Sequence, residues 1–169
     1  TKLLRDLTDY SMSDQLTKQR SDLCNLLRRA YLSCLPLTEG TNKTLTYTSR
    51  VSCAYMPLDS PKMMEALLNL IVNALDAVSD NGSVQIILTK SNEQFVVSII
   101  DDGCGIAPKQ LLTIFHPFTT TKPDGTGLGL PVAKRIIEGH GGHIRVISAP
   151  NQGATFTSLL PCSFSSARK

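Results

Sequence analysis

Three polar side chains interrupt an otherwise apolar segment, NLIVNALDAV, at residues 69–78. On an α-helix, Asn69, Asn73 and Asp76 fall at positions i, i+4 and i+7, and therefore form one stripe. The other positions are apolar nearly all round, which predicts a buried helix whose polar stripe needs a partner. Because an unpaired buried amide costs roughly 1–3 kcal/mol, either the protein or a ligand must supply that partner.

A second group of polar residues follows a predicted strand. Asp101 and Asp102 come directly after FVVSII, and two glycines follow in DDGCGI, at positions 103 and 105. A carboxylate at the end of an apolar strand can accept a hydrogen bond from an exocyclic amine, and glycines allow a flat ring to approach the backbone. The pattern is compatible with an adenine site; an acidic turn is the alternative interpretation.

A third group is the glycine-rich sequence GTGLG at residues 125–129, which leads into the predicted helix LPVAKRII. Free backbone N–H groups and the helix dipole attract an anion at such a helix start. The sequence lacks the GK[ST] of a P-loop and the spacing of a dinucleotide fold, and a flexible connection is the alternative. Amide oxygens such as that of Asn73 suit Mg²⁺, which uses few protein ligands beside phosphate oxygens. The three groups, in this order, favour a nucleotide site.

The elements that must position these groups follow from periodicity and turn signals. We predict helices over residues 21–35, capped by Ser21 or Asp22, over 60–79, capped by Ser60, and over 130–142. Strands are predicted over 45–51, 83–90, 94–101, 143–150 and 153–161, and a long irregular stretch over 101–130 contains a short helix near 109–115. This order predicts an α+β, two-layer sandwich with a mixed sheet of about five strands, covered on one face by helices.

Composition excludes several classes of protein. The net charge of +3 is too weak to indicate nucleic-acid binding. No apolar run approaches the roughly 20 residues of a membrane span, and the start of the chain does not resemble a signal peptide. Five cysteines are scattered without CxxC spacing, which argues against zinc or a disulfide framework and favours a cytoplasmic location. Because the chain lacks an initiator Met, we expect it to be part of a longer protein.

Taken together, the motifs resemble those of the ATP-binding catalytic domain of sensor histidine kinases, in the superfamily shared with gyrase, Hsp90 and MutL. NLIVNALDAV resembles the N box, DDGCGI the G1 box, IFHPF the F box and GTGLGL the G2 box. The similarity covers about residues 20–162 and implies a Bergerat-type ATP-binding fold. The sequence HPFTTTK, with its short lid, most resembles nitrogen-regulation and sporulation-type kinases.

The resemblance implies a role for each residue of the site. Asn73 would bind Mg²⁺, Asp101 and Thr155 would recognise adenine, and Lys122 would reach the γ-phosphate. A lid over residues 107–124 would be anchored by the burial of Phe115 and Phe118. The implied nucleotide-binding residues are Asn69, Asn73, Asp76, Asp101, Gly103, Gly105, Ile106, Lys122, Gly125, Thr126, Gly127, Leu128, Gly129 and Thr155.

The implied activity is transfer of the γ-phosphoryl group of ATP to a His on a dimerisation domain. Residues 1–15 would end the phosphoacceptor hairpin, 16–162 would form the catalytic domain, and 163–169 would be a frayed tail. His116, His140 and His143 lie in the lid or at a glycine turn, so we interpret them as local polar residues and expect the acceptor outside this chain. The implied partners are the protein's own dimerisation domain, in a homodimer, and a response regulator receiver domain, with no nucleic acid and no direct membrane contact.

Two alternatives remain open at this point. Hydrolysing members of the superfamily carry a Glu four residues before the metal-binding Asn, where it activates water. Here that position is Asn69, which favours a kinase over a Bergerat-fold ATPase. A degenerate nucleotide-binding docking module is the second alternative, although none of the four boxes is visibly broken. We expect this domain to be cytoplasmic, whether or not the full-length protein is tethered to a membrane.

Overall fold

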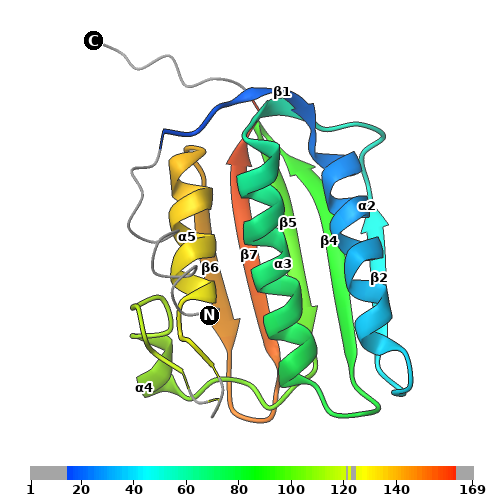
Figure 1. Ribbon diagram of the computed structural model, residues 1–169, viewed down its shortest axis with the longest axis vertical. Coiled ribbons are helices and arrows are strands. Elements are labelled where there is room, and N and C mark those ends of the chain that lie inside the picture. The colour runs from blue at the N-terminus through cyan, green and yellow to red at the C-terminus, as the bar shows by residue number, and fades with distance from the viewer. Residues whose placement is uncertain (1–14, 121, 123–124, 163–169) are drawn as a thin grey trace.

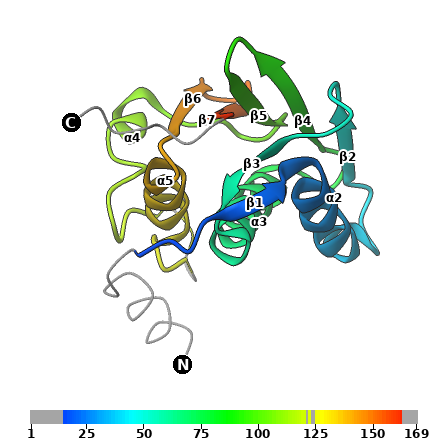
Figure 2. The same cartoon turned by 90° about the horizontal axis from the view of Figure 1, so that it is seen from above.

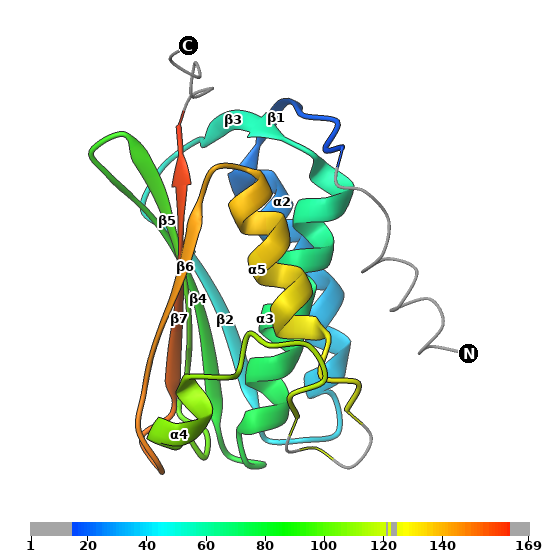
Figure 3. The ribbon, with the colours of Figure 1, turned by 90° about the vertical axis from the view of Figure 1, so that its left-hand side faces the viewer.

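The computed structural model describes residues 15–120, 122 and 125–162, which form two layers. A five-stranded sheet lies behind three helices, and the edge-on view separates the two layers clearly (Figures 1 and 3). The helices are α2 (Leu23–Cys34), α3 (Ser60–Ala77) and α5 (Gly129–Gly139). The predicted α+β fold, with helices on one face of the sheet, is confirmed.

The sheet is mixed, as predicted, and its strand order is β2-β4-β5-β7-β6. Its first strand is parallel to the second, and all other neighbours are antiparallel. The strands are β2 (Thr44–Ser49), β4 (Ser83–Ser91), β5 (Gln94–Asp101), β6 (His143–Ser148) and β7 (Ala154–Pro161).

Buried and half-buried residues alternate strictly along β5, and the buried ones lie on the face of the sheet that the helices cover. In β5 the odd-numbered residues Phe95, Val97 and Ile99 are buried, whereas the even-numbered residues between them are half-buried. Side chains alternate between faces along a strand, so the buried set packs against the helices and the other set lines the open face. Asp101 ends the buried set, which brings a carboxylate to the helix side of the sheet.

Helix α3 packs its apolar face against this sheet. Seven of its residues are buried: Met63, Ala66, Leu67, Leu70, Ile71, Ala74 and Leu75. Burial of each large side chain stabilises the fold by about 1.5–3 kcal/mol. The prediction of a helix buried nearly all round was wrong on the outer side, because Val72 is 36% exposed and Asp76 is exposed. The predicted cap also shifts by one residue, since Asp59, not Ser60, accepts the N–H of Lys62 at 3.1 Å.

The N-terminal part of the described chain contains one feature that the pattern did not predict. Strands β1 (Gln19–Asp22) and β3 (Tyr55–Leu58) pair in a separate two-stranded sheet. Their sequences, QRSD and YMPL, are too short for a recognisable alternation. Asp22 caps α2 by accepting the N–H of Cys24, which agrees with one of the two predicted caps. The helix ends at Cys34 and a short 3₁₀ turn, η1 (Leu35–Thr38), follows it.

Two predicted segments lie outside the described residues. These are the end of the phosphoacceptor hairpin, of which only residue 15 is described, and the C-terminal tail at 163–169. Within the described residues, no helix combines the length and apolar character that crossing a membrane requires.

Candidate functional site

The three groups of polar residues meet at one end of the molecule, the lower end in Figure 1. The C-terminal half of α3, the end of β5, the start of α5 and the turn between β6 and β7 all lie there. The short helix α4 (Pro108–Leu111) belongs to the segment that connects β5 to α5 at this end. Residues far apart in the sequence are thus gathered at one end of the molecule.

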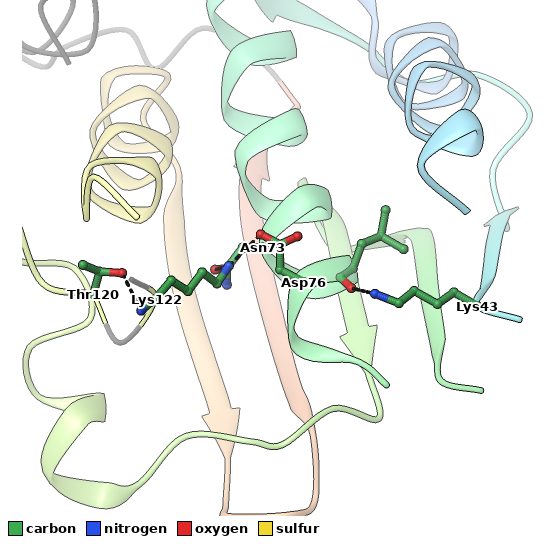
Figure 4. A network of polar contacts seen from close by, with 6 residues as sticks. Lys43, Asn73, Asp76, Thr120 and Lys122 are labelled. Carbon is green, nitrogen blue, oxygen red and sulfur yellow. Dashed lines mark hydrogen bonds and ion pairs between the residues drawn. The ribbon is translucent and has the colours of Figure 1, made fainter. Parts of the chain in front are cut away.

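The polar stripe of α3 has a partner from the lid. The ammonium of Lys122 lies 3.2 Å from Oδ1 of Asn73 and 2.8 Å from Oδ2 of Asp76 (Figure 4). The backbone N–H of Lys122 donates to the hydroxyl of Thr120 at 3.0 Å. Because the Lys122 and Asp76 side chains are 41% and 52% exposed, this ion pair contributes little to stability. Its significance is that an amide oxygen and a carboxylate converge on one cation.

The C-terminus of α3 is stabilised on its other side by Lys43, which Figure 4 also shows. Its ammonium donates to the carbonyl of Leu75 at 2.9 Å. This carbonyl is one of the last four of the helix, which have no partner within the helix itself. Lys43 therefore fixes the helix end that carries the polar stripe.

Asn69 lies beside the start of α5. A Cβ added at Gly129 would stand 3.6 Å from Oδ1 of Asn69, so the carboxamide directly faces the first residue of that helix. Leu128, just before it, is buried at 2% exposure, whereas Thr126 is half-buried. The N-terminus of α5 and the polar stripe of α3 are therefore adjacent, as the predicted phosphate site requires.

Asp101 lies at the end of β5 with 5% of its surface exposed. Its Oδ1 accepts the N–H of Gly103 at 2.9 Å and that of Ala154 at 3.2 Å. Burial raises the pKa of the Asp101 carboxyl above its usual value, and these two N–H groups counteract part of that rise. One oxygen is thus held by the backbone, and none of the described residues donates a hydrogen bond to the other, Oδ2.

Asp102 has a different environment from its neighbour. Its two oxygens accept the N–H and the hydroxyl of Ser83 at 2.8 and 2.7 Å. These hydrogen bonds lower the pKa of Asp102 below its usual value. Asp102 therefore fastens the start of β4 to the end of β5, which leaves Asp101 as the carboxylate of the site.

The glycines of DDGCGI have a packing role in addition to the one predicted. A Cβ at Gly103 would collide with the carbonyl of Ala77, and one at Gly105 would collide with the carbonyl of Ala149. Gly105 also has a φ of +68°, which favours glycine. The N–H of Ile106 donates to the hydroxyl of Ser148 at 2.9 Å. The loop is therefore held between the end of α3 and the β6–β7 turn.

Of the two phenylalanines predicted to anchor the lid by burial, Phe115 is half-buried against the core, and the prediction for Phe118 is wrong. Phe115 packs edge-on against Phe156, with ring centroids 6.5 Å apart, and its neighbour Ile114 is buried at 8% exposure. Phe118, in contrast, is 61% exposed. Its φ of +64° is rare for a bulky residue, and its N–H donates to the carbonyl of Gly127 at 3.0 Å. The backbone of Phe118, not its ring, attaches the lid to the glycine-rich loop.

The glycine-rich loop is compact where it meets the lid. A Cβ at Gly127 would stand 2.5 Å from the carbonyl carbon of Phe118, and Gly127 has a φ of +67°. A Cβ at Gly125 would collide with the hydroxyl of Thr120. Gly127 therefore requires glycine for packing and for backbone conformation, whereas at Gly125 only the space beside Thr120 is restricted.

The predicted contact of Thr155 with the adenine site is wrong. The register pairs Thr155 with Ile100 and pairs Ala154 with Asp101. Because directly paired residues share a face, the Thr155 hydroxyl points to the open face of the sheet, away from Asp101. Sequence reasoning missed Ala154, whose N–H contacts Asp101. The strand register alone distinguishes the two positions.

The polar residues of α3 fit a cation, although the described residues contain no group of three or more His, Cys, Asp or Glu side chains that could hold a metal ion. The oxygens of Asn73 and Asp76 already converge on the ammonium of Lys122. Oxygen atoms of this kind are the ligands that Mg²⁺ prefers. A metal here would take most of its remaining ligands from water or from a bound phosphate.

Comparison with known proteins gives one matching family model and many relatives. The model described as histidine kinase-, DNA gyrase B-, and HSP90-like ATPase matches residues 58–163. The signal transduction histidine-protein kinase AtoS of Escherichia coli K12 is 36% identical over 163 residues, which are 95% of this chain and 26% of AtoS. Sporulation kinase A of Bacillus subtilis is 42% identical over 107 residues, which are 63% of this chain and 18% of that kinase. The chain spans about a quarter or less of these two relatives.

Solved structures share the fold over most of the chain. The nucleotide-free catalytic domain of the histidine kinase ThkA has a TM-score of 0.79 and 28% identity, covering 86% of this chain and 96% of that domain. Full-length ShkA in complex with AMPPNP has a TM-score of 0.85 and 25% identity, covering 95% of this chain and 35% of ShkA. ThkA in complex with the response regulator TrrA has a TM-score of 0.81 and 25% identity, covering 95% and 46% of the two chains.

Proposed function

The chain belongs to the histidine kinase-, DNA gyrase B- and HSP90-like ATPase family, and on this premise we propose that it binds ATP with Mg²⁺ and transfers the γ-phosphoryl group to a His on a separate dimerisation domain. The observation that carries the proposal is the meeting of three polar groups at one end of the sandwich. Asn73 and Asp76 converge on a cation, Asn69 faces the N-terminus of α5, and buried Asp101 ends β5.

In this proposal each group binds one part of the nucleotide. The free Oδ2 of Asp101 accepts the exocyclic amine of adenine, because its Oδ1 is already held by two backbone N–H groups. The N-terminus of α5 attracts the phosphates through its unpaired N–H groups and its dipole. Residues 125–129 border those phosphates, and Lys122 neutralises charge that develops on the γ-phosphate.

Mg²⁺ would be held by Asn73, with Asp76 nearby, on the side where Lys122 now lies. The bound ion would supply charge neutralisation at the phosphates and would orient the γ-phosphoryl group. Transfer through a loose transition state depends mainly on such positioning and charge stabilisation. The residues of this chain therefore bind and orient the donor, and the nucleophile comes from another domain.

Asn69 supports a kinase over an ATPase. Activation of a water molecule requires a group that can accept its proton, and a neutral carboxamide does not do so. Asn69 lies next to Gly129, at the phosphate end of the site. We therefore expect slow hydrolysis in the absence of an acceptor domain.

The test is phosphorylation of the isolated hairpin domain of the full-length protein. With ATP and Mg²⁺, this chain should label one His of that hairpin, and labelling should disappear when that His is replaced. Calorimetry with ADP and Mg²⁺ distinguishes the alternatives. Heat of binding without any labelling of the hairpin refutes the kinase, many turnovers without acceptor indicate an ATPase, and no heat indicates a degenerate docking module.

The remaining expectations about the full-length protein belong to the same proposal. Residues 16–162 form the catalytic domain, which follows a phosphoacceptor hairpin ending near residue 15. The hairpin dimerises, and the phosphoryl group passes from its His to the receiver domain of a response regulator. The structure of ThkA with its response regulator TrrA supports a partner of this class. We propose a cytoplasmic location for this domain, whether or not the full-length protein is tethered to a membrane.

A further inference from the structure

The incoming segment, the described residues 15–18 that precede β1, is attached to the end of the molecule opposite the nucleotide site. Viewed from above, it runs past the end of α5 and leads into β1, which lies over α3 (Figure 2). The backbone N–H of Thr17 donates to Oδ2 of Asp59 at 2.9 Å. A Cβ added at Gly139 would stand 2.9 Å from Cδ1 of Leu16, so the Leu16 side chain packs against the backbone at the end of α5. Residues 16 and 17 thus contact both helices.

Asp59 makes three connections from one position. Its Oδ1 caps α3 by accepting the N–H of Lys62 at 3.1 Å, and its Oδ2 holds Thr17. Its own backbone N–H donates to Nε2 of His140 at 2.9 Å. The residue is 8% exposed, so these bonds are largely shielded from water. Asp59 therefore joins the start of α3, the end of α5 and the incoming segment.

His140 completes the junction from the α5 side. The ring is 4% exposed. Because its Nε2 accepts the Asp59 N–H, its Nδ1 carries the proton and donates to the carbonyl of Ile136 at 2.7 Å. Burial lowers the pKa of His140 below its usual value, and the charge of Lys18 lowers it further. The hydrogen bond to Ile136 and the charge of Asp59 counteract only part of this decrease. The neutral ring thus locks the end of α5 to the start of α3.

The two joined helices carry the nucleotide site at their other ends. Asn69 and Asn73 lie in the C-terminal half of α3, and Gly129 is the first residue of α5. The helices pack side by side and run in opposite directions (Figure 1). The incoming segment is therefore attached to the rigid pair of elements that would hold ATP.

We propose that Asp59 is a positioning residue for phosphoryl transfer to the protein's own hairpin, because it fastens Thr17, next to Leu16, to this helix pair. The inference rests on the proposed function, in which this segment leads from the phosphoacceptor hairpin. A tether with one end fixed limits the orientations of the catalytic domain relative to the hairpin. Restricting orientation raises the effective concentration of one group near the other. Releasing Thr17 moves the fixed point of the tether toward β1 and widens the range of those orientations.

The test uses the full-length protein with its own hairpin. Thr17→Pro removes the N–H donor and leaves the cap of α3 intact. Thr17→Ala, the matched control, keeps the N–H and removes only an exposed side chain. Asp59→Asn is a second variant, since its single amide oxygen can still cap α3 but its NH₂ group cannot accept from Thr17.

We expect Thr17→Pro and Asp59→Asn to lower the rate of autophosphorylation at saturating ATP by roughly tenfold, the loss typical of one charge-assisted hydrogen bond. The KM for ATP should stay within twofold, and Thr17→Ala should behave like the natural protein. The isolated catalytic domain should phosphorylate a separately added hairpin equally well with or without Thr17→Pro, because no tether acts there. A purely structural role would lower the ATP affinity and this separate reaction together.

The possible results separate the two proposals. Variants that autophosphorylate at the natural rate or faster overturn the positioning role of Asp59, while the proposed kinase activity stands. Equal losses with the tethered and the separate hairpin also overturn it. A natural full-length protein that labels no His refutes the proposed function itself.

Discussion

The replacement Asp101→Asn tests the proposed nucleotide site most directly. Oδ1 of Asp101 accepts two backbone N–H groups, and the amide oxygen of Asn can accept the same two. The second carboxylate oxygen, however, becomes an NH₂ group, which cannot accept a hydrogen bond from the adenine amine. The substitution therefore preserves the local fold and removes one charged acceptor from the site.

The magnitude follows from the character of that hydrogen bond. A bond to a charged group contributes about 1.5–3 kcal/mol, which corresponds to a rise in the Kd for ATP of roughly 10- to 100-fold. Stability should hardly fall, because burial disfavours the charged carboxylate, as the raised pKa of Asp101 indicates. The effect should therefore appear in binding and not in the melting temperature.

Calorimetric titration with ATP in excess Mg²⁺ measures the predicted loss. Asp102→Asn is the matched control, because Asp102 binds Ser83 and not the proposed ligand. It should lower the melting temperature slightly and leave the Kd within about twofold. If Asp101→Asn binds ATP as tightly as the natural protein, the adenine assignment is wrong. If both replacements weaken ATP binding equally, the loss reflects a disturbance of the whole loop and not the removal of an adenine contact.

Three further predictions concern backbone, charge and pH. Gly105→Ala should destabilise the fold by at least about 2 kcal/mol, because the new Cβ would collide with the carbonyl of Ala149 and the residue has a left-handed φ. Gly40→Ala is the control: with a φ of +74° and open space around it, it should cost about 1 kcal/mol. Equal losses of stability in thermal denaturation would contradict this reasoning. Lys122→Met should change the free energy of unfolding by less than about 1 kcal/mol, since the ion pair of Lys122 with Asp76 is exposed. It should, however, lower the affinity for ATP relative to that for ADP. An unchanged ratio of the two affinities would exclude a contact of Lys122 with the γ-phosphate. Because the pKa of His140 is lowered in the folded protein, its contribution to stability should be complete above about pH 6.5 and should be lost as the pH falls through the folded pKa. Denaturant unfolding at several pH values should show this loss. In His140→Gln, the part of the pH dependence that comes from His140 should disappear.

The four sequence motifs predicted both the family and the fold, and both are confirmed. Each motif depends on local chemistry: a glycine where the backbone must turn, a carboxylate at a strand end, and amides on one side of a helix. Such features are visible in the order of the residues, because the residues that carry them lie within one element.

The errors arose where a contact depends on another element. Thr155 and Ala154 are equally plausible neighbours of Asp101 in the sequence, and only the register of β7 against β5 separates them. Phe115 and Phe118 are equally apolar, but only Phe115 meets Phe156 of the sheet. The cap of α3 is Asp59, and this residue also binds Thr17 and His140, which lie 42 and 81 positions away.

The sequence by itself determined which residues could bind a nucleotide and which elements carry them, because side-chain type, helical spacing and strand alternation are local properties. The tertiary structure alone decided which oxygens remain available. It placed Lys122 on Asn73 and Asp76, turned Thr155 to the open face, and fastened the incoming segment to α3 and α5. Packing of distant segments sets those pairings, and no short-range pattern encodes the register and packing on which they depend.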